Sequence, residues 1–315
     1  MKPKVSVIIP IFNKANWIEE TLLSVRDQSF QDWECILVDD GSSDESLKRI
    51  NAFIAINPGK WILISQNNAG QCVARNRGIQ EATGEYIALL DGDDTWAPNK
   101  LEVQVKIMDE NEDASLVICP YRIYKPEQKQ VRGRIVYHQN AQKMLKNWFN
   151  LRGFGGGTES TGLIRRSVLD SVGVFDPHLS TSAGLDLSMR LGSQGKILSA
   201  DSTFMKYKIH TGQWHSNLQI LASDLHLLRE KHSEAFGAKG IHLEDQHLAY
   251  LHLHDLREGI SVEKLSAVMR KPRSLFYLVI LVFSIVRRNF VARVRAKYPN
   301  VLTKIPRKYH QFLFS

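Results

Sequence analysis

Cysteines, long apolar runs and internal repeats are all scarce or absent in this chain of 315 residues. The three cysteines, Cys35, Cys72 and Cys119, are odd in number and widely spaced, which argues against a disulfide framework. The sequence also contains no CxxC motif that would indicate a zinc site. The apolar run Leu275–Val286 has 12 residues, whereas a membrane-spanning helix needs about 20. Pro10 breaks the apolar stretch near the start, which therefore fits a first β-strand better than a signal peptide. These absences predict a reducing, cytoplasmic setting.

Acidic residues are missing from the last part of the chain. Residues 264–315 hold twelve Lys or Arg and no Asp or Glu, although the chain as a whole has a net charge of only +8. An apolar run flanked by cations, over residues 271–297, suits an interfacial helix drawn to an anionic membrane surface. The alternative is a buried C-terminal helix with a solvated basic end. The aromatic and glycine patterns of RNA-binding modules are absent, so we expect no nucleic acid partner.

Short apolar runs alternate with helical patterns through the first 120 residues. The runs predict strands at Val5–Ile9, Cys35–Val38, Trp61–Ile64, Tyr86–Leu90 and Leu116–Cys119. Helical patterns lie between them, at Ala15–Val25, from a capping-box spacing at Ser42–Glu45 to Ile54, at Ala69–Ala82, and after Pro98. This rhythm predicts βαβ units and a largely parallel sheet, whose ligands bind at the carboxyl ends of the strands.

The later patterns are coarser. They predict two helices, one strand and a longer helical region, at Leu163–Val172, Leu185–Gln194, Thr203–Ile209 and Leu218 to about Leu256. We expect a catalytic domain over residues 1–217 and a helical, basic region over residues 218–315.

Carboxylates gather at the ends of two predicted strands. One group is Asp39, Asp40 and Asp44, and the other is Asp91, Asp93 and Asp94. Both groups would lie at one edge of the sheet, where like charges repel unless a cation joins them. A hard cation such as Mg²⁺ or Mn²⁺ takes oxygen ligands and often shares them with a phosphate, so the pattern favours a metal–phosphate site. The alternative is a pair of acidic turns that cap helices.

Two stretches carry a family resemblance. "VSVIIPIFNKANWIEETLLSVRDQSFQDWECILVDDGSSDES" and "NNAGQCVARNRGIQEATGEYIALLDGDD" resemble the nucleotide-sugar-binding half of family 2 glycosyltransferases. The similarity runs from Val5 to about Leu101 and resumes more loosely at Leu163–Asp176 and at Tyr207–Asn217. It implies an α/β protein of the GT-A (Rossmann-like) fold, with a mixed, mostly parallel sheet flanked by helices and, here, a helical C-terminal extension.

The resemblance also implies an activity. Such an enzyme moves a sugar, commonly a hexose, from a nucleotide-sugar donor, here expected to be UDP-linked, to an acceptor hydroxyl. The reaction would use Mg²⁺ or Mn²⁺ and invert the anomeric configuration. A saccharide or lipid-linked acceptor, in cell-surface polysaccharide or glycolipid synthesis, would suit a protein peripheral at the inner face of the membrane.

Site residues follow from the family's motifs, position by position. Pro10, Phe12 and Asn13 match the segment that meets the nucleoside, with Phe12 placed to stack on the base. Asp40 matches the aspartate that accepts the imide N–H of a uracil-like base, and Arg75 matches an arginine near the nucleotide.

The remaining matches concern the diphosphate. Asp91 and Asp93 are the DxD pair, in which Asp91 faces ribose or metal-bound water and Asp93 binds the metal. His210 matches a histidine that closes the site and contacts the metal or the diphosphate. The metal and a nearby arginine would stabilise the charge that develops on the departing diphosphate.

The sequence departs from the family at the catalytic base. Relatives commonly read E-D-x-D-L-x-x-R, and the first Asp is the base, but here Gly184 stands at that position and only Asp186 and Arg190 match. Three interpretations stay open. Asp186 acts as the base, Glu159 acts instead, or the protein binds a nucleotide-sugar with degraded catalysis.

A different enzyme class shares one motif. Asp91-Gly92-Asp93-Asp94-Thr95 also fits D-x-D-x-T, the nucleophile loop of aspartate-dependent phosphatases. In those enzymes the motif follows the first strand of the domain, whereas here it follows the fourth predicted strand. The phosphatase interpretation is therefore the weaker one.

Overall fold

The computed structural model describes residues 2–57, 59–125, 130–135, 159–208, 210, 223–224, 227–228 and 230–232. All of these belong to the first of two units, which covers residues 1–237. The predicted basic segment 271–297, and most of the helical region expected from Leu218 onward, lie outside the described residues. Within the described part of the chain, no helix is both long enough and apolar enough to cross a membrane.

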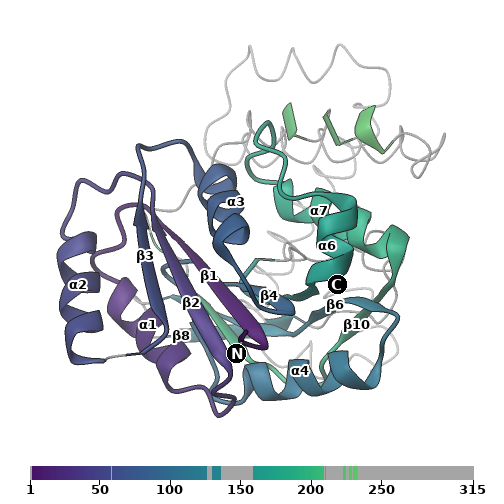
Figure 1. Ribbon diagram of the computed structural model, residues 1–315, viewed down its shortest axis with the longest axis horizontal. Helices are drawn as coiled ribbons and strands as arrows, with labels where there is room; N and C mark the ends of the chain where they lie inside the picture. The colour runs from purple at the N-terminus through teal and green to yellow at the C-terminus, as the bar shows by residue number, and fades with distance from the viewer. Residues whose placement is uncertain are drawn as a thin grey trace, which may run out of the picture. The chain divides into compact units, whose positions relative to one another are not determined.

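The central element is a seven-stranded sheet with the order β10-β6-β9-β4-β1-β2-β3 (Figure 1). Its strands are β1 (Val5–Ile11), β2 (Trp33–Asp39), β3 (Trp61–Ser65), β4 (Tyr86–Leu89), β6 (Ala114–Ile118), β9 (Leu163–Arg165) and β10 (Lys196–Ser199). Neighbouring strands are parallel except where β9 runs antiparallel between β4 and β6. The sheet is therefore mixed and mostly parallel.

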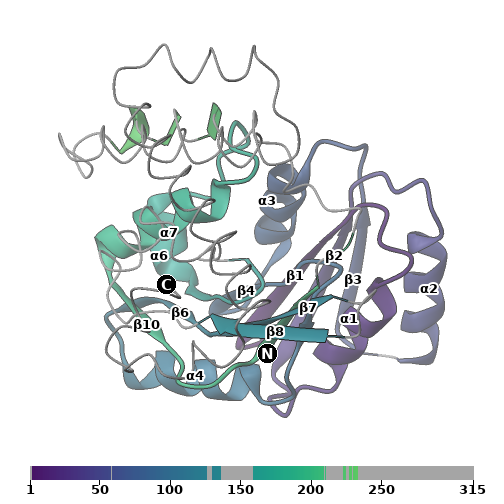
Figure 2. The ribbon, with the colours of Figure 1, turned by 180° about the vertical axis from the view of Figure 1, so that it is seen from behind.

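Every residue of β1 and β2 is buried. Both faces of these apolar strands must therefore be covered, and helices cover them on both sides of the sheet. The helices are α1 (Ile18–Arg26), α2 (Ser46–Ile56), α3 (Gln71–Glu81), α4 (Lys100–Glu110), α6 (Arg166–Val172) and α7 (Ala183–Gln194). The pair α1 and α2 lies on one side of strands β1 to β3 and α3 on the other (Figure 1 and Figure 2). Gly78 permits the close approach of α3, since a Cβ there would stand 2.4 Å from Ile8 Cγ2 of β1.

A smaller sheet adjoins the acidic turn after β4. It has the order β5-β11-β7-β8 and consists of β5 (Thr95–Trp96), β7 (Tyr121–Lys125), β8 (Gln130–Ile135) and β11 (Met205–Lys208). Because β5 pairs with β11, the chain near residue 208 lies beside the turn that holds Asp91 and Asp93. This pairing joins segments more than 100 residues apart in the sequence.

The predicted α/β class, with a mixed, mostly parallel sheet flanked by helices, is confirmed, and the five early strands form as β1, β2, β3, β4 and β6. The predicted helical C-terminal extension lies outside the described residues. Two local predictions are wrong. Leu163 opens the strand β9 instead of a helix, because its side chain is buried between two neighbouring strands, and the helix begins only at Arg166. No side-chain hydrogen bond caps α2 at Glu45; Asp44 Oδ1 instead accepts the N–H of Ser46 (2.9 Å).

Candidate functional site

The strand order brings the predicted site segments to one edge of the sheet. Strand β1 lies between β2 and β4, and all three are parallel. Their carboxyl ends therefore adjoin, which places the loop after β1 between the two acidic turns. The residues predicted from the sequence to bind a nucleotide lie near the end of β1 (Pro10), directly after these three strands, or on the neighbouring helix α3.

The loop after β1 presents an exposed aromatic ring. Phe12 is 46% exposed, although Pro10, two residues earlier, is buried in β1. Asn13 adopts a left-handed backbone conformation (φ 53°), and its N–H donates to Ser42 Oγ (3.0 Å) while its Oδ1 accepts from the N–H of Ser43 (2.9 Å). The loop is thus fixed to the turn after β2 and leaves the Phe12 ring free to stack on a planar group.

Asp40 is a buried carboxylate with a preset orientation. Its Oδ1 accepts from Gln66 Nε2 and from the N–H of Ala69, both at 2.8 Å, and its Oδ2 accepts from the N–H of Gly70 (2.9 Å). These donors precede α3 and hold the group rigid.

The neighbouring Asp39 was not singled out from the sequence as a site residue, although its Oδ1 is buried without a hydrogen-bond partner among the described residues. The signal available in the sequence was its place in the same acidic turn.

The buried Arg75 forms an ion pair with Asp91, whose side chain is partly exposed. Arg75 Nη2 lies 2.7 Å from Asp91 Oδ1, and Gln71 Nε2 donates to the same oxygen (3.0 Å). Burial alone would lower the pKa of Arg75, but Asp91 and Glu159 raise it overall, so the guanidinium stays charged. The Cζ atom of the Arg75 guanidinium lies 5.2 Å from the centre of the Phe175 ring.

Asp93 is held by two basic groups. His210 Nε2 lies 3.1 Å from Asp93 Oδ2, and Lys14 Nζ donates to the same oxygen. Burial opposes ionisation, but the hydrogen bond from His210 and the charge of Lys14 outweigh it and lower the pKa of Asp93 to about 2. The His210 ring stacks on Trp17, with centroids 5.0 Å apart. Sequence reasoning missed Lys14, although it directly follows Asn13 in the loop after β1.

Asp94 ties the acidic turn together. Its N–H donates to the carbonyl of Asp91 (3.0 Å), its Oδ2 lies 2.6 Å from Ser160 Oγ, and its Oδ1 accepts from the N–H of Lys208 (3.2 Å). Burial, together with the charges of Asp93 and Asp91, raises the pKa of Asp94 well above its usual value. The three clustered carboxyls therefore avoid repulsion in different ways: Arg75 pairs with the first, basic groups hold the second, and burial favours the neutral form of the third.

The donor set fits a divalent cation that also binds phosphate. Within the described residues no three His, Cys, Asp or Glu side chains form a complete metal site. Asp93 and His210 nevertheless converge on one point, with Asp91 two residues away on the same turn. Mg²⁺ is commonly held by one or two carboxylates while substrate phosphates supply further oxygens, and imidazole suits softer divalent ions. The protein therefore supplies only some of the ligands of such a cation, and the phosphate oxygens of a nucleoside diphosphate would supply the others.

The carboxylate of Glu159 lies where a side chain on residue 184 would begin. A Cβ added to Gly184 would stand 2.1 Å from Glu159 Oε1 and 2.3 Å from Glu159 Cδ, so a side chain there would require the carboxylate to move. Glu159 Oε1 also lies 3.7 Å from Arg75 Nη1. The structure therefore brings Glu159 next to the Arg75–Asp91 pair.

Asp186 lies on α7 among basic side chains. Its carboxylate contacts His232 Nε2 (2.8 Å), Lys231 Nζ (3.1 Å) and Arg190 Nη2 (2.7 Å), and the side chain is fully buried. Burial opposes the ionised form, but the bonds from His232 and Arg190 lower its pKa far below the usual range. Asp186 thus acts here as an anchor for α7.

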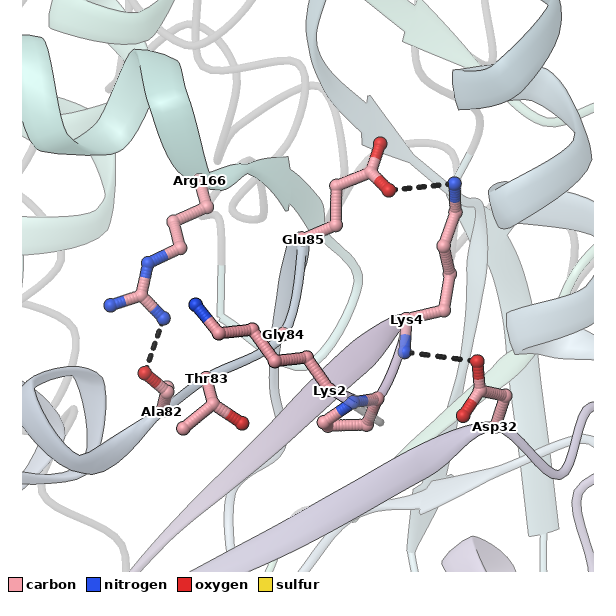
Figure 3. Close-up of a pocket in the computed structure, with 9 residues that line it drawn as sticks. Lys2, Lys4, Asp32, Ala82, Thr83, Gly84, Glu85 and Arg166 are labelled. Atoms are coloured by element: carbon pink, nitrogen blue, oxygen red, sulfur yellow. Dashed lines mark hydrogen bonds and ion pairs between the residues drawn. The ribbon is translucent and has the colours of Figure 1, made fainter.

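A cavity of about 630 Å³ lies away from this edge. It is lined by residues at the amino ends of β1 and β4, among them Lys4, Gly84 and Arg166 (Figure 3). The Lys4 N–H donates to Asp32 Oδ2 (3.2 Å) and its ammonium pairs with Glu85 (2.8 Å). None of the site residues predicted from the sequence lines this cavity.

Comparisons with known proteins point to one family. The family model described as Glycosyl transferase family 2 matches residues 6–173, just over half of the chain. A putative teichuronic acid biosynthesis glycosyltransferase, TuaG of Bacillus subtilis (strain 168), is 42% identical over 107 residues, which are 34% of this chain and 42% of that protein. Glycosyltransferase GlyG of Streptococcus pneumoniae serotype 4 is 36% identical over 124 residues, 39% of this chain and 41% of the relative. The matches thus span less than half of each relative.

Solved structures share the fold. The crystal structure of S. aureus TarS 1-349 in complex with UDP-GlcNAc superposes with a TM-score of 0.61 at 19% identity, covering 84% of this chain and 78% of that one. The structure of the same TarS segment in complex with UDP gives a TM-score of 0.59. The expected GT-A fold is confirmed by this likeness.

Proposed function

The chain belongs to glycosyl transferase family 2, and on that premise we propose that it transfers a sugar from a UDP-linked donor to an acceptor hydroxyl in cell-surface polymer synthesis. One observation carries the proposal. An exposed aromatic ring, a fixed carboxylate and the Arg75–Asp91 and Asp93–His210 pairs all lie at the carboxyl ends of three adjacent strands. This set supplies contacts for a base, a ribose and a diphosphate. Family membership leaves the phosphatase interpretation of D-x-D-x-T without support.

Two residues would select the nucleoside. Phe12 would stack on the base, a contact that tolerates any planar ring. Asp40 would accept the imide N–H of uracil, for which one lone pair of Oδ2 remains beside the bond from Gly70. Cytosine carries no proton at that ring position, so a carboxylate there favours UDP over CDP.

Other residues would bind and stabilise the diphosphate. Asp93 and His210 would hold Mg²⁺ or Mn²⁺ with support from Asp91, and the bound ion would offset the negative charge of the leaving group. Arg75 and Lys14 add two fixed cations of the chain itself beside these carboxylates. Their charges favour a bound diphosphate and its departure as an anion.

The reaction is a displacement at the anomeric carbon. The acceptor oxygen forms a bond to that carbon while the bond to the diphosphate oxygen breaks, and the hydroxyl proton passes to a carboxylate base. Attack from the face opposite the leaving group inverts the configuration. The acceptor would be a saccharide or a lipid-linked saccharide, and the similarity to TuaG, a putative teichuronic acid biosynthesis glycosyltransferase, supports a polysaccharide acceptor.

Attachment to an anionic membrane surface through residues 271–297, at the inner face of the membrane, stays a prediction from charge and apolarity in the sequence. It would bring the site close to a lipid-linked acceptor. Vesicles containing anionic lipid should therefore sediment the full chain at low salt and release it at high salt.

Calorimetry with nucleotides tests the proposed function. UDP should bind the full chain more tightly with Mn²⁺ than without it, and more tightly than CDP under the same conditions. Asp93→Asn should remove most of the gain from Mn²⁺, whereas Glu110→Gln, an exposed change at the end of α4, should keep it. Equal affinities for UDP and CDP would contradict the role of Asp40, and a lack of any effect of Mn²⁺ would contradict the metal site.

A further inference from the structure

We propose that Glu159 is the general base of this glycosyltransferase and that Gly184 is the residue that makes room for it. The inference rests on the proposed function, because a base needs an acceptor hydroxyl to deprotonate. It assigns the proton to a side chain from a different segment than α7. The catalytic carboxylate would thus be supplied by position 159 instead of position 184.

The first argument is spatial. A Cβ on residue 184 would stand 2.1 Å from Glu159 Oε1 and 2.3 Å from both Cδ and Oε2, whereas real Cβ atoms stay beyond 3.0 Å of such neighbours. All three atoms belong to the carboxylate, so the charged end itself fills the space next to Gly184. The backbone conformation does not require glycine here, since 184 is the second residue of α7 and is not among the residues with positive φ. The Glu159 carboxylate therefore lies directly against Gly184, and a side chain at position 184 would require this carboxylate to move away.

The second argument is that the backbone at Glu159 is fixed to the donor site. Ser160 Oγ accepts the N–H of Asp91 (3.1 Å) and lies 2.6 Å from Asp94 Oδ2. Trp96 Nε1 donates to the Ser160 carbonyl (2.7 Å). Two contacts thus join Ser160 to the acidic turn and a third joins it to β5, which positions the preceding residue beside the turn.

The third argument concerns charge and free lone pairs. Glu159 Oε1 lies 3.7 Å from Arg75 Nη1, and Arg75 Nη2 lies 2.7 Å from Asp91 Oδ1, so one guanidinium separates the carboxylate from the DxD turn. At that distance the interaction with Arg75 is an ion pair without a hydrogen bond, which leaves the carboxylate oxygens able to accept from a hydroxyl. The side chain is 25% exposed, so a substrate can reach it.

Asp186 lacks these properties. It is fully buried, and its two oxygens already accept from His232, Lys231 and Arg190. A carboxylate that is stabilised as an anion by several cations is a weak base. Its contacts hold α7 in place and leave the proton transfer to Glu159.

The proton balance of the step is simple. As the acceptor oxygen attacks the anomeric carbon, its O–H bond breaks and the proton passes to a carboxylate oxygen of Glu159. The electron pair of the breaking carbon–oxygen bond leaves with the diphosphate. The neutral Glu159 then returns its proton to solvent.

Substitution of the base and its restoration at the other position test the proposal. The readout is release of UDP from four donors, UDP-glucose, UDP-galactose, UDP-GlcNAc and UDP-GalNAc, with water as the acceptor. Glu159→Gln should lower the rate on the donor that is turned over by about 100-fold or more, the usual contribution of general-base catalysis. UDP affinity with Mn²⁺ and the melting temperature should stay unchanged. Glu110→Gln is the matched control and should keep full activity.

The restoring variant separates chemistry from packing. Glu159→Ala combined with Gly184→Asp places a carboxylate on α7 in the space that is vacated, and should regain at least tenfold over Glu159→Ala alone. Glu159→Ala combined with Gly184→Asn has the same shape without a base and should stay inactive. The acidic limb of the pH–rate profile should return in the first double variant and be missing in the second.

Each result has a distinct meaning. If Glu159→Gln retains the wild-type rate, or the Asn and Asp double variants are equally active, Glu159 is not the base and this inference is overturned while the proposed function stands. If the unsubstituted chain turns over none of the four donors and does not bind UDP, the proposed function itself fails and the inference fails with it. Binding of UDP without turnover of any donor would support degraded catalysis and would overturn the assignment of a base.

Discussion

Arg75 Nη2 lies 2.7 Å from Asp91 Oδ1 while Arg75 Nη1 lies 3.7 Å from Glu159 Oε1, so one buried guanidinium contacts the donor turn and the proposed base together. Both carboxylates would lose their nearest cation if this side chain were removed. Arg75 thus connects the turn that would bind the diphosphate with the proposed base. Its effects on stability and on reaction rate can be separated by substitution.

We expect Arg75→Met to destabilise the protein by about 1–3 kcal/mol, because it removes a charge-assisted contact from Asp91, whose side chain is itself 23% exposed. Arg75→Lys should restore much of this stability because a positive charge returns. It should not restore turnover, since an ammonium cannot contact two carboxylates with the planar geometry of a guanidinium. Urea denaturation and UDP release from the donor measure the two effects, and a fully active Arg75→Lys would contradict the dual role.

Phe12→Ala should weaken UDP binding by about 1–3 kcal/mol, which is typical of a base stacked on an aromatic ring. The melting temperature should hardly change, because the side chain is 46% exposed and buries little apolar surface. Phe12→Tyr keeps a flat ring and serves as the control. An unchanged UDP affinity in Phe12→Ala would show that the base binds elsewhere.

Asp224 holds the loop that leads into α7. Its carboxylate accepts the N–H groups of Ser180 (3.1 Å), Thr181 and Ser182 (2.8 Å), and also the Thr181 hydroxyl (2.9 Å). Asp224→Ala would leave these donors without their acceptor, and a buried unsatisfied group such as the Ser182 N–H costs about 1–3 kcal/mol. We therefore expect a clear loss of stability in urea denaturation. Asp170→Ala, which removes an exposed acid on α6, should change stability by no more than about 0.5 kcal/mol.

Lys100 makes stability depend on pH in the alkaline range. Burial lowers the pKa of this lysine from 10.5 to about 8, with its ammonium 2.6 Å from Gln104 Oε1. Between about pH 8 and 10.5 the unfolded chain keeps a proton that the folded chain has lost, so stability rises with pH through that window.

The change should amount to about 3 kcal/mol over the whole window. Lys100→Met removes the titrating group and should lack this increment. The difference in unfolding free energy between the unsubstituted chain and Lys100→Met is therefore expected to shift in favour of the lysine as pH rises from 7 to 10. A difference that is flat across these pH values would mean that the lysine stays charged when folded.

The sequence was sufficient to predict the sheet and the edge that carries the site, because βαβ units leave the carboxyl ends of parallel strands adjacent. Asp40, Asp91 and Asp93 could be placed there from the ends of apolar runs alone. The three-residue strand β9 could not be distinguished from the helix that follows it directly, since short apolar runs fit either structure.

Contacts between distant segments were also beyond prediction. Ser160 reaches Asp94 across 66 positions, and Asp224 reaches Ser180 across 44. Likewise, the glycine at 184 indicated a missing base, but only the folded chain shows which carboxylate fills the space. Periodicity describes single elements, whereas these pairings depend on how loops fold back onto the sheet.

The anchoring of Asp186 by Lys231 and His232 has a practical consequence for anyone who prepares a shorter version of the protein. Ending the chain at residue 217, where the resemblance to relatives stops, would keep every carboxylate of the donor turn. It would also discard the side chains that secure the helix carrying Gly184. Such a fragment should still capture a nucleotide but turn its sugar over poorly, so expression designs should extend past residue 232.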